Sequence, residues 1–226
     1  MKLLNQIEKS TCLLLDKRFG NWFELCQQAE QHGINLEPFV AGSQNLPFLR
    51  YDHIDEDKLP PRYPQSTNYP TWYTKQAYNA WKCHKKIIKR ALDQGCQNLL
   101  MMEDDIQFES DYWEILGKTE SFFLNNPWDI IYWGAYYYNN QVIKITENIR
   151  KLGQNTAGFH CVLLKRNILE ILDDILPYGP IDWLVSEFLH KKFDTYAIYP
   201  SIVTQKDNIF SFIEQSILKK PSRYGM

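Results

Sequence analysis

The sequence predicts an α/β fold, a three-layer α/β/α sandwich built on a mostly parallel but mixed central sheet. Short apolar runs alternate with amphipathic stretches of helical period, which is typical of strands alternating with helices. The most informative run, Leu99 to Met102, ends abruptly in Glu103, Asp104 and Asp105. Four consecutive apolar residues suit a strand buried on both faces, and open α/β sheets bind ligands at the carboxyl ends of such strands.

The first elements form a strand–helix–strand unit. Residues 11–15 are expected to form a buried strand, followed by a helix that Asn21 caps and Gly33 terminates. Residues 36–41 are expected to form the second strand. This order predicts a right-handed crossover and two neighbouring parallel strands.

The rest of the chain continues the alternation within a single domain, residues 1–226. Five prolines crowd residues 43–71, which predicts a long irregular loop, and whether it closes over a ligand stays open. Residues 208–226 are expected to be a partly mobile tail. Helices are expected at residues 74–94, 111–123, 167–175 and 181–192, and strands at 99–102, 129–133, 142–146, 159–164 and 195–199.

Composition narrows the classes of protein. The formal net charge of −2 argues against a broad nucleic-acid interface. Aromatic residues make up 15%, which fits sugar-stacking surfaces and a plain aromatic core equally well. The five cysteines are scattered without a CxxC pair, so we expect buried free thiols and no zinc site. No apolar run suits a signal peptide or reaches the ~20 residues of a membrane span, so we expect a cytoplasmic protein without a transmembrane segment. Peripheral membrane association stays open.

The three adjacent carboxylates point to a cation. Burying like charges side by side is costly, and a hard divalent ion that prefers oxygen ligands neutralises them. The alternative is a solvated turn, or the first turn of the helix expected from Asp111. A buried strand running straight into the triplet favours a metal or substrate site.

Seven motifs follow one another along the chain: Leu14–Arg18, Phe39–Gly42, Trp81–Lys85, Leu100–Ile106, Trp128–Gly134, Pro180–Asp182, and Tyr199–Pro200 with Gln205. In this order they resemble the motifs of glycosyltransferase family 25, the lipooligosaccharide and collagen galactosyltransferase group. The resemblance covers about residues 11 to 213, with Cys83 in place of the family's usual Ser and Trp133 in place of Leu.

This resemblance implies a GT-A type fold and a metal-dependent, inverting hexosyltransferase. The donor would be a UDP-sugar, with galactose or glucose favoured, and the acceptor a hydroxyl of a glycan or protein. The cation would be Mn²⁺ or Mg²⁺, held by Asp105 first, then Asp104, then Glu103. Asp182 is the expected catalytic base, and the residues expected to bind the donor are Leu15, Asp16, Arg18, Ala41, Lys82, His84, Glu103 and Asp104.

Several of these residues have ordinary structural roles as alternatives. Arg18 suits a phosphate but equally suits a solvated turn, and His84 on a helix is more often a packing residue. Asp182 could be a charge at a helix N-terminus. Tyr136 and Trp183 could form a sugar-stacking wall for the acceptor or simply pack.

Two other functions remain open from the sequence. The chain could be a nucleotide-sugar or carbohydrate-binding protein without turnover on the same fold. It could also be a metal-dependent phosphohydrolase, although such centres gather ligands from several strand ends and the sequence offers one acidic cluster.

Overall fold

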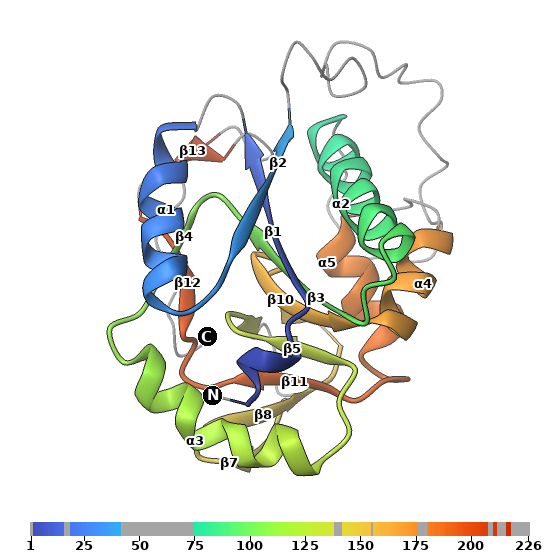
Figure 1. Cartoon of the computed structure of the whole chain (residues 1–226). Coiled ribbons are helices and arrows are strands. Elements are labelled where there is room, and N and C mark those ends of the chain that lie inside the picture. Colours follow the sequence, from blue (N-terminus) through green and yellow to red (C-terminus); the bar gives the residue numbers. More distant parts are fainter. Residues whose placement is uncertain are drawn as a thin grey trace.

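The computed structural model describes residues 2–15, 19–41, 75–137, 142–154, 156–175, 180–207, 210–211 and 216–217. Within them an eight-stranded sheet crosses the molecule in the order β2-β1-β3-β10-β5-β11-β8-β7 (Figure 1). Its strands are β1 (Lys9–Leu15), β2 (Leu36–Ala41), β3 (Asn98–Glu103), β5 (Ile130–Tyr132), β7 (Val142–Thr146), β8 (Ile149–Leu152), β10 (Cys161–Lys165) and β11 (Thr195–Ile198). Three two-stranded pairs lie beside it: β4 (Ile106–Phe108) with β12 (Val203–Gln205), β6 (Tyr136–Tyr137) with β9 (Thr156–Ala157), and β13 (Phe210–Ser211) with β14 (Ser216–Ile217).

The central sheet is mixed but mostly parallel. Strand β1 pairs in parallel with both β2 and β3, and β5 pairs in parallel with β11. Strand β10 is antiparallel to β3 and β5, and β8 is antiparallel to β11 and β7. Six of the eight strands therefore run in one direction, which confirms the expected sheet. The reversal of β10 in the middle of the sheet was not predicted.

Helices cover both faces of the sheet, so the predicted three-layer sandwich is confirmed. The two faces separate because side chains alternate along β3: Leu99 and Met101 pack on one side, Leu100 and Met102 on the other. Helices α2 (Lys75–Asp93), α4 (Arg166–Asp174) and α5 (Ile181–Leu184) cover the first side, and α1 (Phe19–Gln31) and α3 (Tyr112–Asn125) cover the second (Figure 1).

Some element boundaries differ from the sequence-based expectation. Helix α1 begins at Phe19, before the expected cap at Asn21. The helix expected over 181–192 is α5 followed by a π-helical turn, η6 (Val185–Leu189), and the chain opens with a 3₁₀ turn, η1 (Leu4–Gln6). Strands β4, β8 and β12 were not predicted from the sequence. The Pro-rich segment 43–71 and most of residues 208–226 lie outside the described residues.

The five cysteines are free thiols, and all but Cys26 are buried. The expectation of free thiols is confirmed for all five, and the expectation of burial for four of them. Among the described residues, no helix combines the length and the apolar character needed to cross a membrane.

Candidate functional site

The carboxyl ends of β1, β2 and β3 meet at one edge of the sheet. Leu15 lies opposite Ala41 in the β1–β2 register, and Leu13 lies opposite Glu103 in the β1–β3 register. The backbone N–H of Leu15 donates a hydrogen bond to Asp104 Oδ2 over 2.8 Å. The structure therefore brings together four residues that the sequence assigned to donor binding.

The three consecutive carboxylates face three different partners. Glu103 Oε1 lies 3.8 Å from His84 Nε2, while Asp104 accepts from Leu15. Asp105 Oδ2 accepts a 3.4 Å hydrogen bond from Gln205 Nε2. Asp104 and Asp105 are buried and Glu103 is half-buried. The side chains thus diverge, and the described part of the chain contains no cluster of three or more His, Cys, Asp or Glu side chains that could hold a metal ion.

The negative charge of the triplet reaches into the core beneath it. Burial is the main cause that raises the pKa of Cys12, and the charges of Asp104, Asp105 and Glu103 raise it further. Cys12 is paired with Met102 in the β1–β3 register, directly before the triplet. The edge therefore has an anionic field that a cation would relieve.

These carboxylates fit one common mode of cation binding. Mg²⁺ at nucleotide sites is usually held by one or two carboxylates together with substrate phosphates and water, without an all-protein cage. Asp105 and Glu103, flanking the buried Asp104, are the oxygen donors that this mode requires. They could hold Mg²⁺ or Mn²⁺ once a diphosphate supplies further oxygens.

His84 lies on the inner face of α2, against the triplet. Its ring is buried and meets Phe159 edge-on, with centroids 5.7 Å apart. Burial lowers the pKa of His84 to about 4, against the opposing effect of the Ala80 carbonyl. The imidazole beside Glu103 is therefore neutral at pH 7. Lys82 lies two positions earlier on the helix, on a different face, and its donor role stays a prediction.

Asp182, the predicted base, is the second residue of α5, after Ile181, and Pro180 is the N-cap of this helix. Its Oδ1 accepts a 2.9 Å hydrogen bond from the Trp183 backbone N–H, and the Gly158 backbone also bonds to the carboxylate. Burial raises the pKa of Asp182, although these hydrogen bonds act in the opposite direction. A carboxylate with a raised pKa is a stronger base, which suits the predicted role.

One electrostatic interaction and two ring contacts lie between Asp182 and His84, the partner of Glu103. Burial raises the pKa of Tyr132 well above its ordinary value, and the charge of Asp182 raises it further. The ring centroid of Phe159 lies 6.5 Å from that of Tyr132 and 5.7 Å from that of His84. Phe159 therefore lies beside His84, the partner of Glu103, and beside Tyr132, whose pKa the charge of Asp182 raises.

Two residues of this edge carry no role in the sequence-based assignment. The His160 carbonyl accepts from the Glu103 N–H over 2.9 Å, and its buried ring stacks on Tyr136 at 5.1 Å. Burial lowers the pKa of His160 to about 4, opposed by the charge of Asp105 and by the Val203 carbonyl. Gln205, known only as part of a motif, bonds to Asp105. Only the antiparallel direction of β10 brings His160 to this edge, and no local pattern reveals that direction.

The remaining predicted residues lie as follows. Tyr136 is half-buried on β6, and its hydroxyl donates a 2.8 Å hydrogen bond to Gln205 Oε1. Trp183 is half-buried and packs edge-on against Phe188. Their acceptor roles stay predictions. Asp16 and Arg18 lie outside the described residues.

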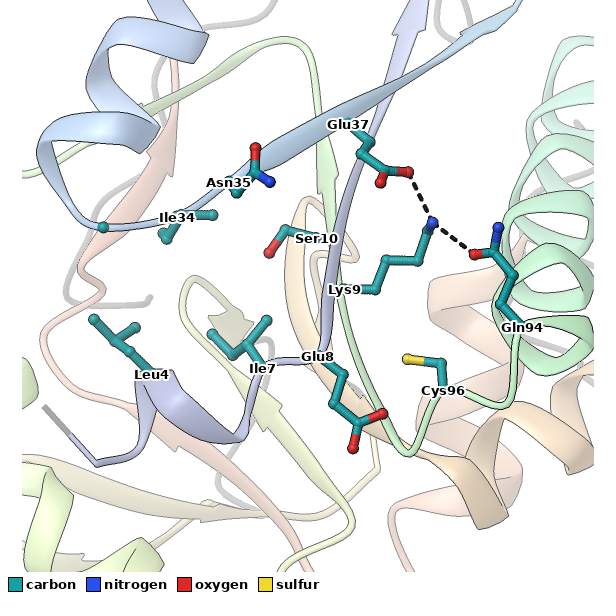
Figure 2. Close-up of a pocket in the computed structure, with 11 residues that line it drawn as sticks. Leu4, Ile7, Glu8, Lys9, Ser10, Ile34, Asn35, Glu37, Gln94 and Cys96 are labelled. Carbon is teal, nitrogen blue, oxygen red and sulfur yellow. Dashed lines mark hydrogen bonds and ion pairs between the residues drawn. The ribbon is translucent and has the colours of Figure 1, made fainter.

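A cavity of about 320 Å³ lies at the opposite end of the first strands (Figure 2). Lys9, on the first residue of β1, pairs there with Glu37 and donates to Gln94, each over 2.7 Å. Because this cavity lies at the amino end of β1 and the triplet follows the carboxyl end of β3, the cavity is separate from the predicted site.

Comparison with known proteins adds a likeness of fold. Neither the protein-family models nor the curated proteins give a match. Among solved structures, a UDP-glucose pyrophosphorylase complexed with UDP-glucose matches with a TM-score of 0.50 and 10% identity, over 85% of this chain and 90% of that one. The chain shares this protein's fold. The GT-A-like sandwich expected from the sequence is thereby supported, while membership of family 25 receives no support of its own.

Two further structures are similar at lower scores. A glycosyltransferase involved in the glycosylation of the major capsid of PBCV-1 matches with a TM-score of 0.41 and 12% identity, covering 80% of this chain and 75% of that one. A197 from STIV matches with a TM-score of 0.42 and 11% identity, covering 96% and 97%.

Proposed function

We propose that the chain is a metal-dependent, inverting glycosyltransferase that moves a hexosyl group from a UDP-sugar to a hydroxyl of a glycan or protein. Galactose and glucose are the favoured sugars. The observation that carries the proposal is the hydrogen bond from the Leu15 N–H to Asp104, which fixes an acidic turn between the carboxyl ends of β1 and β3. The shared fold with a UDP-glucose pyrophosphorylase supports a nucleotide-sugar donor at this edge.

In this proposal each residue of the edge has a separate task. Leu15 and Ala41 line the slot for the nucleotide base, and Asp105 with Glu103 provides oxygen ligands. A bound divalent cation supplies Lewis-acid stabilisation of the diphosphate leaving group. His84 is neutral and buried, and it contacts Glu103 without adding a positive charge that would compete with the cation.

Asp182 would take the proton from the acceptor hydroxyl as the new glycosidic bond forms. Burial raises the pKa of this carboxyl, which strengthens it as a base, and backbone donors at Trp183 and Gly158 hold it in place. Tyr136 and Trp183 would present aromatic faces to the acceptor sugar.

Isothermal titration with UDP and Mn²⁺ tests donor binding. Asp105→Asn should weaken Mn²⁺-dependent UDP binding at least 10-fold, because the amide keeps the shape of the side chain and loses its charge. Asp93→Asn is the matched control, since Asp93 lies exposed at the far end of α2, paired with Lys89. Equal affinity in wild type and Asp105→Asn would refute the metal site.

Turnover is tested separately, because a binding protein without activity on this fold would pass the titration. UDP release from UDP-galactose and UDP-glucose, with and without a panel of glycan acceptors, identifies the donor. Asp182→Asn should abolish transfer while donor affinity stays within about 2-fold of wild type. Donor binding without transfer or hydrolysis would favour the non-catalytic alternative. Release of phosphate from simple esters would favour a phosphohydrolase.

A further inference from the structure

Gln205 links two side chains of the candidate site. Its Nε2 donates to Asp105 Oδ2 over 3.4 Å, and its Oε1 accepts from the Tyr136 hydroxyl over 2.8 Å. Asp105 lies one hundred residues before Gln205 in the sequence. The contact with Tyr136 joins β12 with β6.

The backbone holds Gln205 firmly in this place. In the antiparallel β4–β12 pair Gln205 lies opposite Ile106, the residue that follows Asp105. The next N–H along, of Lys206, donates to the Asp105 carbonyl over 2.6 Å. The backbone on the carboxyl side of Asp105 is therefore tied to the strand that carries Gln205.

Tyr136 is fixed from its other side. Its ring stacks on buried His160 with an interplanar angle of 28°, and β6 pairs it with Ala157. The hydroxyl therefore reaches Gln205 from a rigid position. An amide is the side chain that accepts from a phenol and donates to a carboxylate at once, whereas a carboxylate at position 205 would repel Asp105.

We infer that Gln205 is a positioning residue that orients the Asp105 carboxylate toward a divalent cation, and that Tyr136 fixes the orientation of Gln205. This inference rests on the proposed function. It assigns Tyr136 a task at the donor side of the site in addition to the acceptor wall. Partners of this kind around metal-binding carboxylates tune affinity without contacting the ion.

The test compares UDP affinity with Mn²⁺ and UDP affinity with EDTA, by isothermal titration of the full chain. Gln205→Met keeps the length of the side chain and removes both hydrogen bonds. It should weaken UDP binding with Mn²⁺ about 10-fold and leave binding with EDTA unchanged. A merely structural role would lower both affinities together. Gln97→Met is the matched control, because Gln97 bonds locally to the Gly95 carbonyl outside the site.

Tyr136→Phe provides an independent second variant. It keeps the ring that stacks on His160 and removes only the hydroxyl, so it should fold and should weaken Mn²⁺-dependent binding about 3- to 5-fold. The double variant should bind no more weakly than Gln205→Met alone, because both changes act through one chain of contacts. Additive losses, or Mn²⁺-dependent binding at wild-type strength in both single variants, would overturn the inference while leaving the proposed function intact. Failure of the wild type to bind UDP with Mn²⁺ would overturn both.

Discussion

Among the glycines in the described part of the chain, Gly134 leaves the least room for a side chain. It follows β5, and a Cβ atom there would fall inside 3.0 Å of both the Val203 carbonyl oxygen and His160 Nε2. Neither neighbour moves easily, because the Val203 N–H bonds to the Trp133 carbonyl and His160 is buried. Gly134→Ala must therefore shift backbone, and overpacking of this kind costs about 3 kcal/mol or somewhat more.

Gly117 provides a control, because the same substitution, glycine to alanine, should there raise the stability of the chain. It lies exposed in the middle of α3, and a Cβ there meets nothing within 4 Å. Gly117→Ala should stabilise the chain by about 0.5–1 kcal/mol, because alanine favours the helix and restricts the unfolded chain.

Urea denaturation and thermal denaturation, each followed by tryptophan fluorescence, measure the stability of both variants. For a chain of this length about 3 kcal/mol corresponds to a fall in Tm of roughly 6–12 °C. Gly134→Ala should also weaken Mn²⁺-dependent UDP binding, since it displaces His160 and the strand that leads to Gln205. The reasoning about close packing is refuted if Gly134→Ala unfolds at or above the wild-type midpoint.

Two further predictions concern buried polar groups. Asp104→Ala leaves the Leu15 N–H without its acceptor, so the free energy of unfolding measured with urea should fall by about 1–3 kcal/mol. The loss is smaller if the substitution also relieves repulsion from the neighbouring carboxylates. An unchanged urea midpoint would contradict a structural role for that hydrogen bond. Stability should also fall as the pH drops from about 6.5 to about 4. Three buried histidines have a pKa of about 4 in the folded chain and about 6.5 in the unfolded chain. The unfolded state therefore binds more protons between these two pH values, which favours unfolding. Each of these histidines contributes about 3 kcal/mol to the free energy of unfolding above pH 6.5. A urea midpoint that is constant from pH 7 to pH 5 would contradict this prediction. The three are His84, His160 and His190.

The sequence predicted the layers well because they follow from local patterns. The apolar run Leu99–Met102 is buried on both faces, and β2 spans the expected residues, Leu36–Ala41. The edge that carries the candidate site was also predictable in part, since strand ends in a parallel unit must meet at one edge. Leu15, Ala41 and Asp104 lie together there for that reason.

The partners of these residues were not predictable from local patterns. The divergence of the three carboxylates depends on a neutral histidine from α2, a backbone N–H from β1 and an amide from β12. Each partner comes from a different part of the chain, and periodicity within a segment carries no information about such pairings. The resemblance placed Gln205 in a motif, but only the β4–β12 register shows that it reaches Asp105.

The reversed strand β10 explains why the site contains residues from outside the strand–helix–strand unit. A strand parallel to β3 would bring its carboxyl end, Lys165, to the edge that carries Glu103. Because β10 runs antiparallel, the segment that precedes it lies there instead, with Gly158, Phe159 and His160. Gly158 bonds to Asp182, and Phe159 separates Tyr132 from His84. The direction of one buried strand thus decides whether the predicted base and the acidic triplet share an edge. An apolar run in the sequence does not indicate which way its strand runs in the sheet, so the direction of β10 could not be predicted from local patterns.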